Sequence, residues 1–263
     1  MELTVKGKKA YAYTGGKMFD ANLPTVVFCH GAQSDHSAWI LQSRYLAHHG
    51  HGVLALDLPG HGRSEGPALA RVEDLADWIE AVLDAAGVKQ ASVVGHSMGS
   101  LVALECAARH PARVARIALL ATAYPMKVSA ELLDATRDNE PLAQDMVNIW
   151  SHLAYAQYPG NPGPGFWVIG ENLRLMQRQK PGVMHVDFSA CNAYEGGGAA
   201  AAKVQCPALF LLARRDVMTA ARSAQAFAQT VKGARIVMIE GSGHNMMGEK
   251  PDEVLDALVA FLK

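Results

Sequence analysis

The sequence predicts an α/β protein with a mostly parallel, doubly wound sheet of about eight strands. Short apolar runs bounded by turn residues recur along the chain, and those at residues 24–29 and 52–57 are typical of strands buried on both faces. Helical patterns alternate with these runs, and the clearest is the amphipathic stretch 72–86, which Gly87 ends. Because strands that alternate with helices form parallel sheets covered on both faces, these observations define the fold class.

The elements of this sheet can be assigned in chain order. Residues 3–13 are strand-like and are broken by a turn near Gly7, which indicates a hairpin at the edge of the sheet. The strands expected after the hairpin cover residues 24–29, 52–57, 90–94, 114–121, 207–213 and 234–239. The helices expected between and after them cover residues 36–49, 72–86, 100–110, 220–231 and 252–262.

The alternation of strands and helices breaks between residues 122 and 203. This stretch has helical patterns only, at residues 131–139, 142–153, 166–179 and 199–203. We therefore expect a helical cap, residues 122–203, inserted after the sixth strand. The core domain is then made of residues 1–121 and 204–263.

Charge and composition exclude several classes of function. The 263 residues include 24 Lys and Arg against 25 Asp and Glu, so no basic excess indicates a nucleic-acid partner. No stretch is long and apolar enough to span a membrane, and the first residues lack the apolar run of a signal peptide. The four cysteines are scattered, as in reduced proteins. These features predict a cytoplasmic protein with neither a nucleic-acid nor a membrane partner.

One serine, Ser97, stands in a sequence pattern that is typical of nucleophilic serines. Gly95 and Gly99 lie two residues on either side of Ser97, between a strand-like and a helix-like stretch. A sharp strand-to-helix turn exposes the side chain at its apex, and the positions two residues away pass too close to neighbouring backbone for a side chain. The following helix directs its N-terminus at the serine, which favours negative charge there. The pattern predicts a nucleophilic Ser97.

A serine hydroxyl needs a base, and the base needs an acid that orients it. After such a turn the expected chain order is serine, then acid, then histidine. Asp216 follows the predicted strand 207–213, and His244 follows the predicted strand 234–239. Because the carboxyl ends of parallel strands meet at one edge of the sheet, we expect Ser97, Asp216 and His244 to lie together at that edge.

The chain resembles the α/β-hydrolase superfamily over nearly its whole length. The motifs that carry the resemblance lie at residues 30–32, 57–64, 95–99, 215–216 and 243–244. The resemblance implies that Ser97 is the nucleophile, that His244 is the general base and then the general acid, and that Asp216 orients the histidine. It also implies an oxyanion hole formed by the backbone N–H groups of Ala32 and Met98, and it implies no cofactor.

Asp57 is an alternative candidate for the acid, and a cluster of histidines is a candidate for a metal site. Asp57 also ends a predicted strand at this edge and is an alternative acid, although hydrogen bonds that pin the following loop are its more common role. His48, His49 and His51 are close in sequence, but no cysteine or carboxylate stands at ligand spacing from them. We therefore expect no metal site.

These residues together predict a serine hydrolase that cleaves small to medium carboxylic esters through an acyl-enzyme intermediate. Its partner would be a small-molecule ester, and a homodimer is left open. The candidates for the substrate pocket are Gln33, His96, Met126, Trp150 and Trp167. The same triad also serves thioester hydrolysis, C–C bond hydrolysis of ring-cleavage diketones and peracid formation, and a ligand receptor on this scaffold is the non-enzymatic alternative.

Overall fold

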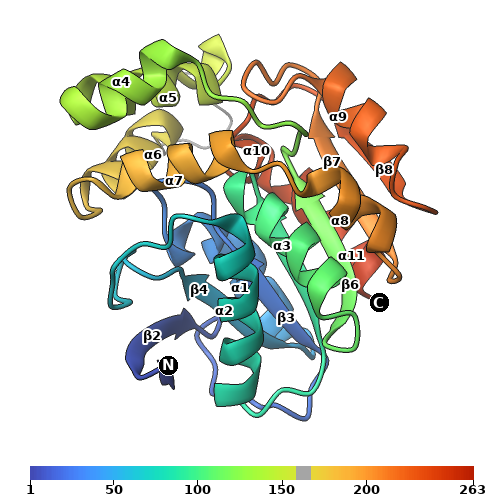
Figure 1. The fold of residues 1–263 in the computed structure, drawn as a ribbon. Coiled ribbons are helices and arrows are strands. Elements are labelled where there is room, and N and C mark those ends of the chain that lie inside the picture. The colour runs from blue at the N-terminus through green and yellow to red at the C-terminus, as the bar shows by residue number, and fades with distance from the viewer. Residues whose placement is uncertain (158–166) are drawn as a thin grey trace.

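A computed structural model of the chain describes residues 1–157 and 167–263, and a mixed sheet runs through its centre (Figure 1). The described strands form an eight-stranded sheet in the order β1-β2-β4-β3-β5-β6-β7-β8. Their bounds are β1 Glu2–Val5, β2 Lys8–Tyr13, β3 Thr25–Cys29, β4 Gly52–Asp57, β5 Ala91–His96, β6 Val114–Leu120, β7 Ala208–Ala213 and β8 Arg235–Ile239. Only the β1–β2 and β2–β4 pairs are antiparallel. The predicted fold class, with its edge hairpin, is confirmed.

Helices cover both faces of this sheet. Their bounds are α1 Ile40–His48, which follows the 3-10 turn η1 His36–Trp39, α2 Val72–Ala85, α3 Met98–Arg109, α9 Ala221–Ala228, α10 Met246–Glu249 and α11 Pro251–Leu262. Side chains alternate between the faces along each strand. Val27 packs in the apolar cluster with α2 and α3, whereas Val26 and Phe28 pack in the cluster with α1 and α11. The sheet is therefore doubly wound, as predicted.

A second group of helices lies between β6 and β7. They are α4 Ala130–Asp138, α5 Glu140–Ser151, the 3-10 turn η2 Ala154–Gln157, α6 Val168–Gln177, α7 Val183–Ala193 and α8 Gly197–Lys203. Helices α4 to α7 stand over one end of the sheet (Figure 1) and share an apolar cluster that includes Leu132, Met184 and Phe188. Helix α8 instead packs on α3, because Ala200 and Ala201 belong to the cluster of the sheet.

The helices predicted for this region differ from those of the structure in two respects. Helix α7 was not predicted, and α8 packs with the core although the predicted cap extends to residue 203. The predicted helix 166–179 is α6, and its first position, residue 166, lies outside the described residues. The helices that the structure describes include none with the length and apolar character needed to cross a bilayer.

Candidate active site

Ser97 occupies a strained turn between β5 and α3. Its φ is 51° and its ψ is −118°, a left-handed conformation that non-glycine residues seldom adopt. A Cβ at Gly95 would collide with the carbonyl oxygen of Gly99, and one at Gly99 would collide with the carbonyl oxygen of Cys29. The two glycines are therefore required for this turn, which lifts the Ser97 side chain above the end of the sheet.

His244 and Asp216 form a hydrogen-bonded pair at the same edge. His244 lies in the loop after β8, and its Nδ1 donates to Asp216 Oδ2 at 2.8 Å. The other donors to Asp216 are Thr219 Oγ1 at 2.6 Å, Thr219 N at 2.8 Å and Met218 N at 2.8 Å. Burial alone would raise the pKa of Asp216, but the neighbouring His244 and the Thr219 donors hold it at about 2. Asp216 is thus an ionised acceptor that fixes the orientation of the imidazole.

The loop that carries His244 is attached to the segment that follows α5. Glu249, which is 3% exposed, accepts hydrogen bonds from Gly243 N at 2.6 Å and from Leu153 N at 2.8 Å. Asn245 N donates to the carbonyl of Ser151 at 2.9 Å. On the core side, His96 Nε2 donates to the carbonyl of His244 at 2.9 Å. Sequence reasoning missed Glu249 because its partners lie up to 96 positions away along the chain.

Glu249→Gln is expected to lower the free energy of unfolding by about 1–3 kcal/mol, because one amide oxygen cannot replace two carboxylate acceptors and a buried N–H is left unpaired. Urea unfolding monitored by circular dichroism measures the loss. Glu253→Gln is the matched control, since Glu253 is exposed and forms a surface ion pair with Lys250 at 3.3 Å. That variant should change stability by less than about 0.5 kcal/mol. Equal losses in the two variants would show that the buried carboxylate contributes nothing specific.

The two segments of the expected oxyanion hole meet next to Ser97. Met98 is the first residue of α3, so its N–H has no partner within the helix. Ala32 follows β3, and it lines the same cavities as Ser97 and His244. The structure therefore brings all five predicted catalytic and oxyanion residues to one place.

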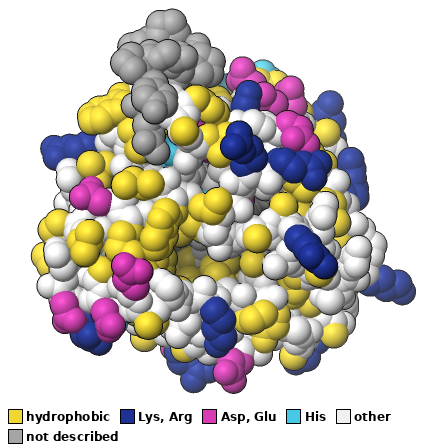
Figure 2. All heavy atoms as spheres, turned by 90° about the horizontal axis from the view of Figure 1, so that it is seen from above, with side chains coloured by type: hydrophobic (Ala, Val, Ile, Leu, Met, Phe, Trp, Pro, Cys, Tyr) yellow, Lys and Arg dark blue, Asp and Glu magenta, His cyan; other side chains and the backbone are white. Residues whose placement is uncertain are grey.

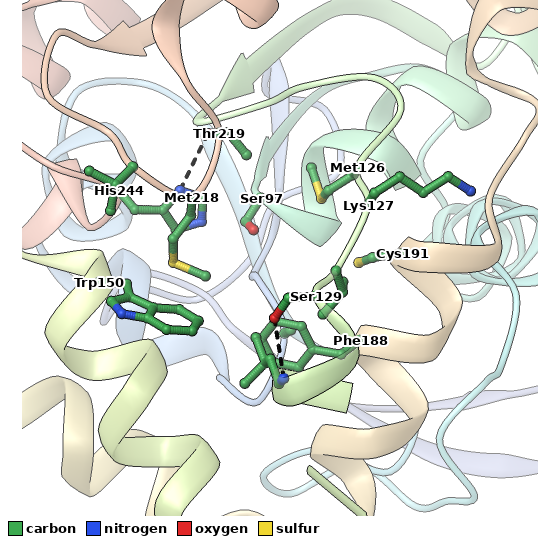
Figure 3. A pocket seen from close by; sticks show the side chains of 14 residues that line it. Ser97, Met126, Lys127, Ser129, Trp150, Phe188, Cys191, Met218, Thr219 and His244 are labelled. Atoms are coloured by element: carbon green, nitrogen blue, oxygen red, sulfur yellow. Dashed lines mark hydrogen bonds between the residues drawn. The ribbon is translucent and has the colours of Figure 1, made fainter. Parts of the chain in front are cut away.

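A cavity of about 390 Å³ opens beside Ser97 and His244 (Figure 3). Its walls are mainly apolar, and they include the predicted pocket residues Met126 and Trp150. Phe188 of α7 and Met218 of the loop after β7 also line this cavity. From above, the molecule shows a hollow bordered largely by hydrophobic side chains (Figure 2). These surroundings suit an apolar group attached to the reacting carbon.

A second, smaller cavity of about 50 Å³ also contacts Ser97 and His244, and it is more polar. Gln33 and His96, both predicted for the pocket, line this second cavity. The side-chain amide of Gln33 donates to Glu140 Oε1 and to the carbonyl of Met176, each at 3.1 Å. Its Oε1 is buried and has no hydrogen-bond partner among the residues that the structure describes.

Trp167, which was also predicted for the pocket, lies at the surface of the described structure. Its side chain is 64% exposed and lines neither cavity among the described residues. The ring lies against Gly170, where a Cβ would overlap it. Trp167 precedes α6, and its position at the helix end directs the ring along the outside of the helix rather than into the site.

Asp57 has a structural role. The donors to its carboxylate are His36 N at 2.8 Å, His36 Nδ1 at 2.6 Å and Arg63 N at 2.8 Å, so it pins the loops after β3 and β4.

Asp35, His36 and Asp57 also form the one described group whose potential metal-ligand atoms lie within 4.8 Å of one another. Arg178 already pairs with Asp35 at 2.6 Å, so these atoms are engaged by protein donors. The group is a structural hydrogen-bond network.

Comparisons with known proteins agree with this fold. A family model described as alpha/beta hydrolase fold matches residues 24–251. The (E)-2-((N-methylformamido)methylene)succinate hydrolase of Acinetobacter baylyi is 27% identical over 245 residues, which cover 90% of each chain. The 2-hydroxymuconate semialdehyde hydrolase of Pseudomonas putida is 34% identical over 128 residues, 43% of this chain and 45% of that protein. The enol-lactonase from Burkholderia xenovorans LB400 superposes with a TM-score of 0.88 at 24% identity, over 100% of this chain and 99% of that one.

The fold and the match of the family model over most of the chain define a hydrolase of the α/β class. The protein belongs to the α/β-hydrolase family.

Proposed function

We propose that the protein is a serine esterase that cleaves small to medium carboxylic esters through an acyl-enzyme. The observation that carries this proposal is the 2.8 Å hydrogen bond between His244 and Asp216, because His244 lines a mainly apolar cavity together with Ser97. A small-molecule ester is the only partner that the proposal requires, and no cofactor takes part. The cysteines of the chain are free, in keeping with a proposed cytoplasmic location.

The mechanism follows from the position of each group. Ser97 Oγ attacks the ester carbonyl and gives its proton to His244 Nε2, while the N–H groups of Ala32 and Met98 hold the negative oxygen. His244 then donates this proton to the departing alcohol. A water molecule attacks the acyl-enzyme and gives a proton to His244, which passes it to Ser97 Oγ as the carboxylic acid leaves. Asp216 keeps the imidazole oriented and stabilises its charged form throughout.

The lining of the cavities supports an ester over a ring-cleavage diketone. A diketone with acid groups would need cations in its pocket, and Arg174 and Arg178 are the sequence candidates. Arg178 is paired with Asp35, and Arg174 Nη1 donates to Gln177 Oε1 at 3.0 Å. Neither arginine lines either of the two cavities beside Ser97. Among the described residues, the cation that does line the larger cavity is Lys127, and its Nζ donates to the carbonyl of Asn192 at 2.9 Å. We assign the acyl group to the larger apolar cavity, and the small alcohol or water to the second one.

A substrate screen tests this proposal. Wild-type protein is offered p-nitrophenyl esters of increasing acyl length, one thioester and one ring-cleavage diketone, and a fluorophosphonate probe reports a reactive serine. We expect labelling of Ser97 and the highest kcat/KM for an ester of medium chain length. Faster cleavage of the diketone would assign the protein to C–C hydrolysis. Binding of ligands with neither labelling nor turnover would make it a receptor.

Trp150→Ala is expected to raise KM for an octanoyl ester about 10-fold and to leave KM for an acetyl ester almost unchanged, because the long acyl chain loses an apolar wall. Steady-state kinetics on both esters measures the difference. Trp167→Ala is the matched control, since this tryptophan is exposed and lines neither cavity. It should alter neither KM. An equal effect of both substitutions on both esters would contradict the assignment of the acyl group to this cavity.

A further inference from the structure

We propose that Asp187 of cap helix α7 is a positioning residue that holds the oxyanion turn, residues 31–33, in its active shape. The inference rests on the proposed function, because it concerns the hole that would stabilise the negative oxygen of the reacting ester. Asp187 is 1% exposed. It is in the helix that the sequence did not predict, and the triad does not use it.

The carboxylate of Asp187 reaches two core loops through the same oxygen. Its Oδ2 accepts a hydrogen bond from Gln33 N at 2.8 Å and another from His61 Nε2 at 2.8 Å. Gln33 is the last residue of the oxyanion turn, which follows β3, and His61 lies in the loop after β4. Asp187 thus joins a cap helix to the backbone segment that provides one oxyanion donor.

The oxyanion turn needs external support because its backbone is strained. Gln33 has a φ of +53°, a conformation that costs free energy in a non-glycine residue. A peptide group is planar, so the hydrogen bond from Gln33 N to Asp187 fixes the plane of the peptide group that joins Ala32 to Gln33. The peptide group that joins Gly31 to Ala32 contains the N–H of Ala32. It is held from the core side, since His30 Nδ1 donates to the carbonyl of Gly31 at 2.8 Å. With the peptide planes on both sides of Ala32 held, the N–H bond of Ala32 keeps a fixed direction.

His61 supplies the charge that balances Asp187. Its Nδ1 is 3.1 Å from the carbonyl oxygen of Pro59, and its Nε2 faces the carboxylate. Both partners are acceptors only, so both ring nitrogens must donate, which requires the imidazolium form. Burial lowers the pKa of His61, but Asp187 and the Pro59 carbonyl raise it above its ordinary value. The neighbouring ring of His30, 4.8 Å away, does not compete for the charge, because burial lowers its pKa to about 4.

An ion pair suits this place better than a lone carboxylate would. An isolated negative charge behind the turn would oppose the negative oxygen that forms on the substrate. The His61–Asp187 pair has no net charge, so it holds the turn without this penalty. The next residue of α7, Phe188, lines both cavities, so one turn of the helix contacts the substrate space and the oxyanion turn together.

Asp187→Asn tests the proposal, because it keeps the size of the side chain and removes the charge. Without the carboxylate charge, burial favours the neutral form of His61, which donates from Nδ1 to the carbonyl of Pro59 and presents a lone pair at Nε2. The amide then turns its N–H₂ toward Nε2, and Gln33 N loses its acceptor. Loss of a whole oxyanion donor lowers kcat about 100- to 1000-fold, so a misplaced donor should lower it about 10- to 100-fold. KM should change less than about threefold, since ground-state binding does not use the hole. The affinity for a trifluoromethyl ketone that mimics the tetrahedral intermediate should fall in proportion to kcat/KM.

Tyr194→Phe is the matched control. Tyr194 caps the other end of α7, is 3% exposed, and donates to Glu105 Oε2 on α3 at 2.5 Å, away from the oxyanion turn. This variant also loses a buried hydrogen bond to the core, so its melting temperature should fall. Its kcat and its affinity for the ketone should stay at wild-type values.

The outcomes separate the inference from the proposed function. If wild-type protein hydrolyses esters but Asp187→Asn only melts earlier, like Tyr194→Phe, then Asp187 merely fastens the cap and the inference is wrong. If wild-type protein hydrolyses no ester, the proposed function is wrong, and with it the inference that rests on it.

If Asp187→Asn does not fold, His61→Asn is used in its place, since this variant leaves Asp187 hydrogen-bonded to Gln33 but removes the cation beside the carboxylate. It should lower kcat and ketone affinity together, and unchanged values of both would overturn the inference.

Discussion

Ser97→Ala is expected to abolish ester hydrolysis while the protein keeps its fold. In a serine triad the nucleophile accounts for about 10⁶-fold in kcat, because its loss prevents formation of the acyl-enzyme. Alanine adopts the φ of 51° as well as serine does, and the two glycines that permit the turn remain. The side chain of Ser97 opens onto the cavities, so its hydroxyl can be removed without a void in the core. Kinetics with a p-nitrophenyl ester and thermal unfolding measure both parts of the expectation.

Ser129 provides the control for this experiment, because it opens onto the same cavity (Figure 3) but caps α4, with Leu132 N donating to its Oγ at 3.2 Å. Ser129→Ala should still react with a fluorophosphonate at Ser97 and should lose about 1 kcal/mol of stability with its cap. Ser97→Ala should not be labelled. Turnover by Ser97→Ala above a small fraction of the wild-type rate would reject the nucleophile assignment.

The parts of the fold that follow from local physics could be predicted. Strands such as β3 and β4 are buried on both faces and therefore read as continuous apolar runs. The edge at which Ser97, Asp216 and His244 meet follows from the direction of parallel strands, without knowledge of any tertiary contact. The turn at Ser97 could be predicted because its glycines are required by close backbone contacts, which leave a trace in the sequence.

The cap could be predicted only in outline. Helix α7 buries Asp187 in the same stripe as Met184 and Phe188, and its partly exposed face carries the apolar Val186, so polarity does not clearly separate its two faces. The pattern also could not show that Trp150 faces the cavity and Trp167 faces solvent, because the direction of a cap side chain depends on how the helices pack.

The buried acids Asp187 and Glu249 lie beyond sequence reasoning for a related cause. Each is defined by partners far along the chain, Gln33 for the first and Leu153 for the second. No local spacing encodes such a contact. The supports of the site were therefore found only in the structure, whereas the reacting groups were predicted.

Asp216→Asn is expected to lower kcat about 10³- to 10⁴-fold, because an amide can stabilise the wrong tautomer of His244 and cannot stabilise its charged form. The variant should also lose stability in a pH-dependent way. The pKa of Asp216 is held at about 2, below the ordinary value of about 4. The stabilisation is therefore complete above pH 4 and is lost as the pH falls toward 2. The difference in melting temperature between Asp216→Asn and wild type should shrink over this range.

Asp57→Asn is the comparison that tests whether Asp216 is the acid of the triad. Asp57 ends β4 and is also buried, but its partners are His36 and Arg63. An amide in its place leaves a buried N–H without an acceptor, which should cost about 1–3 kcal/mol of stability, with kcat per folded molecule little changed. Measurement of kcat and melting temperature for both variants separates the roles. A large loss of kcat in Asp57→Asn, with near-normal turnover in Asp216→Asn, would transfer the catalytic role to Asp57.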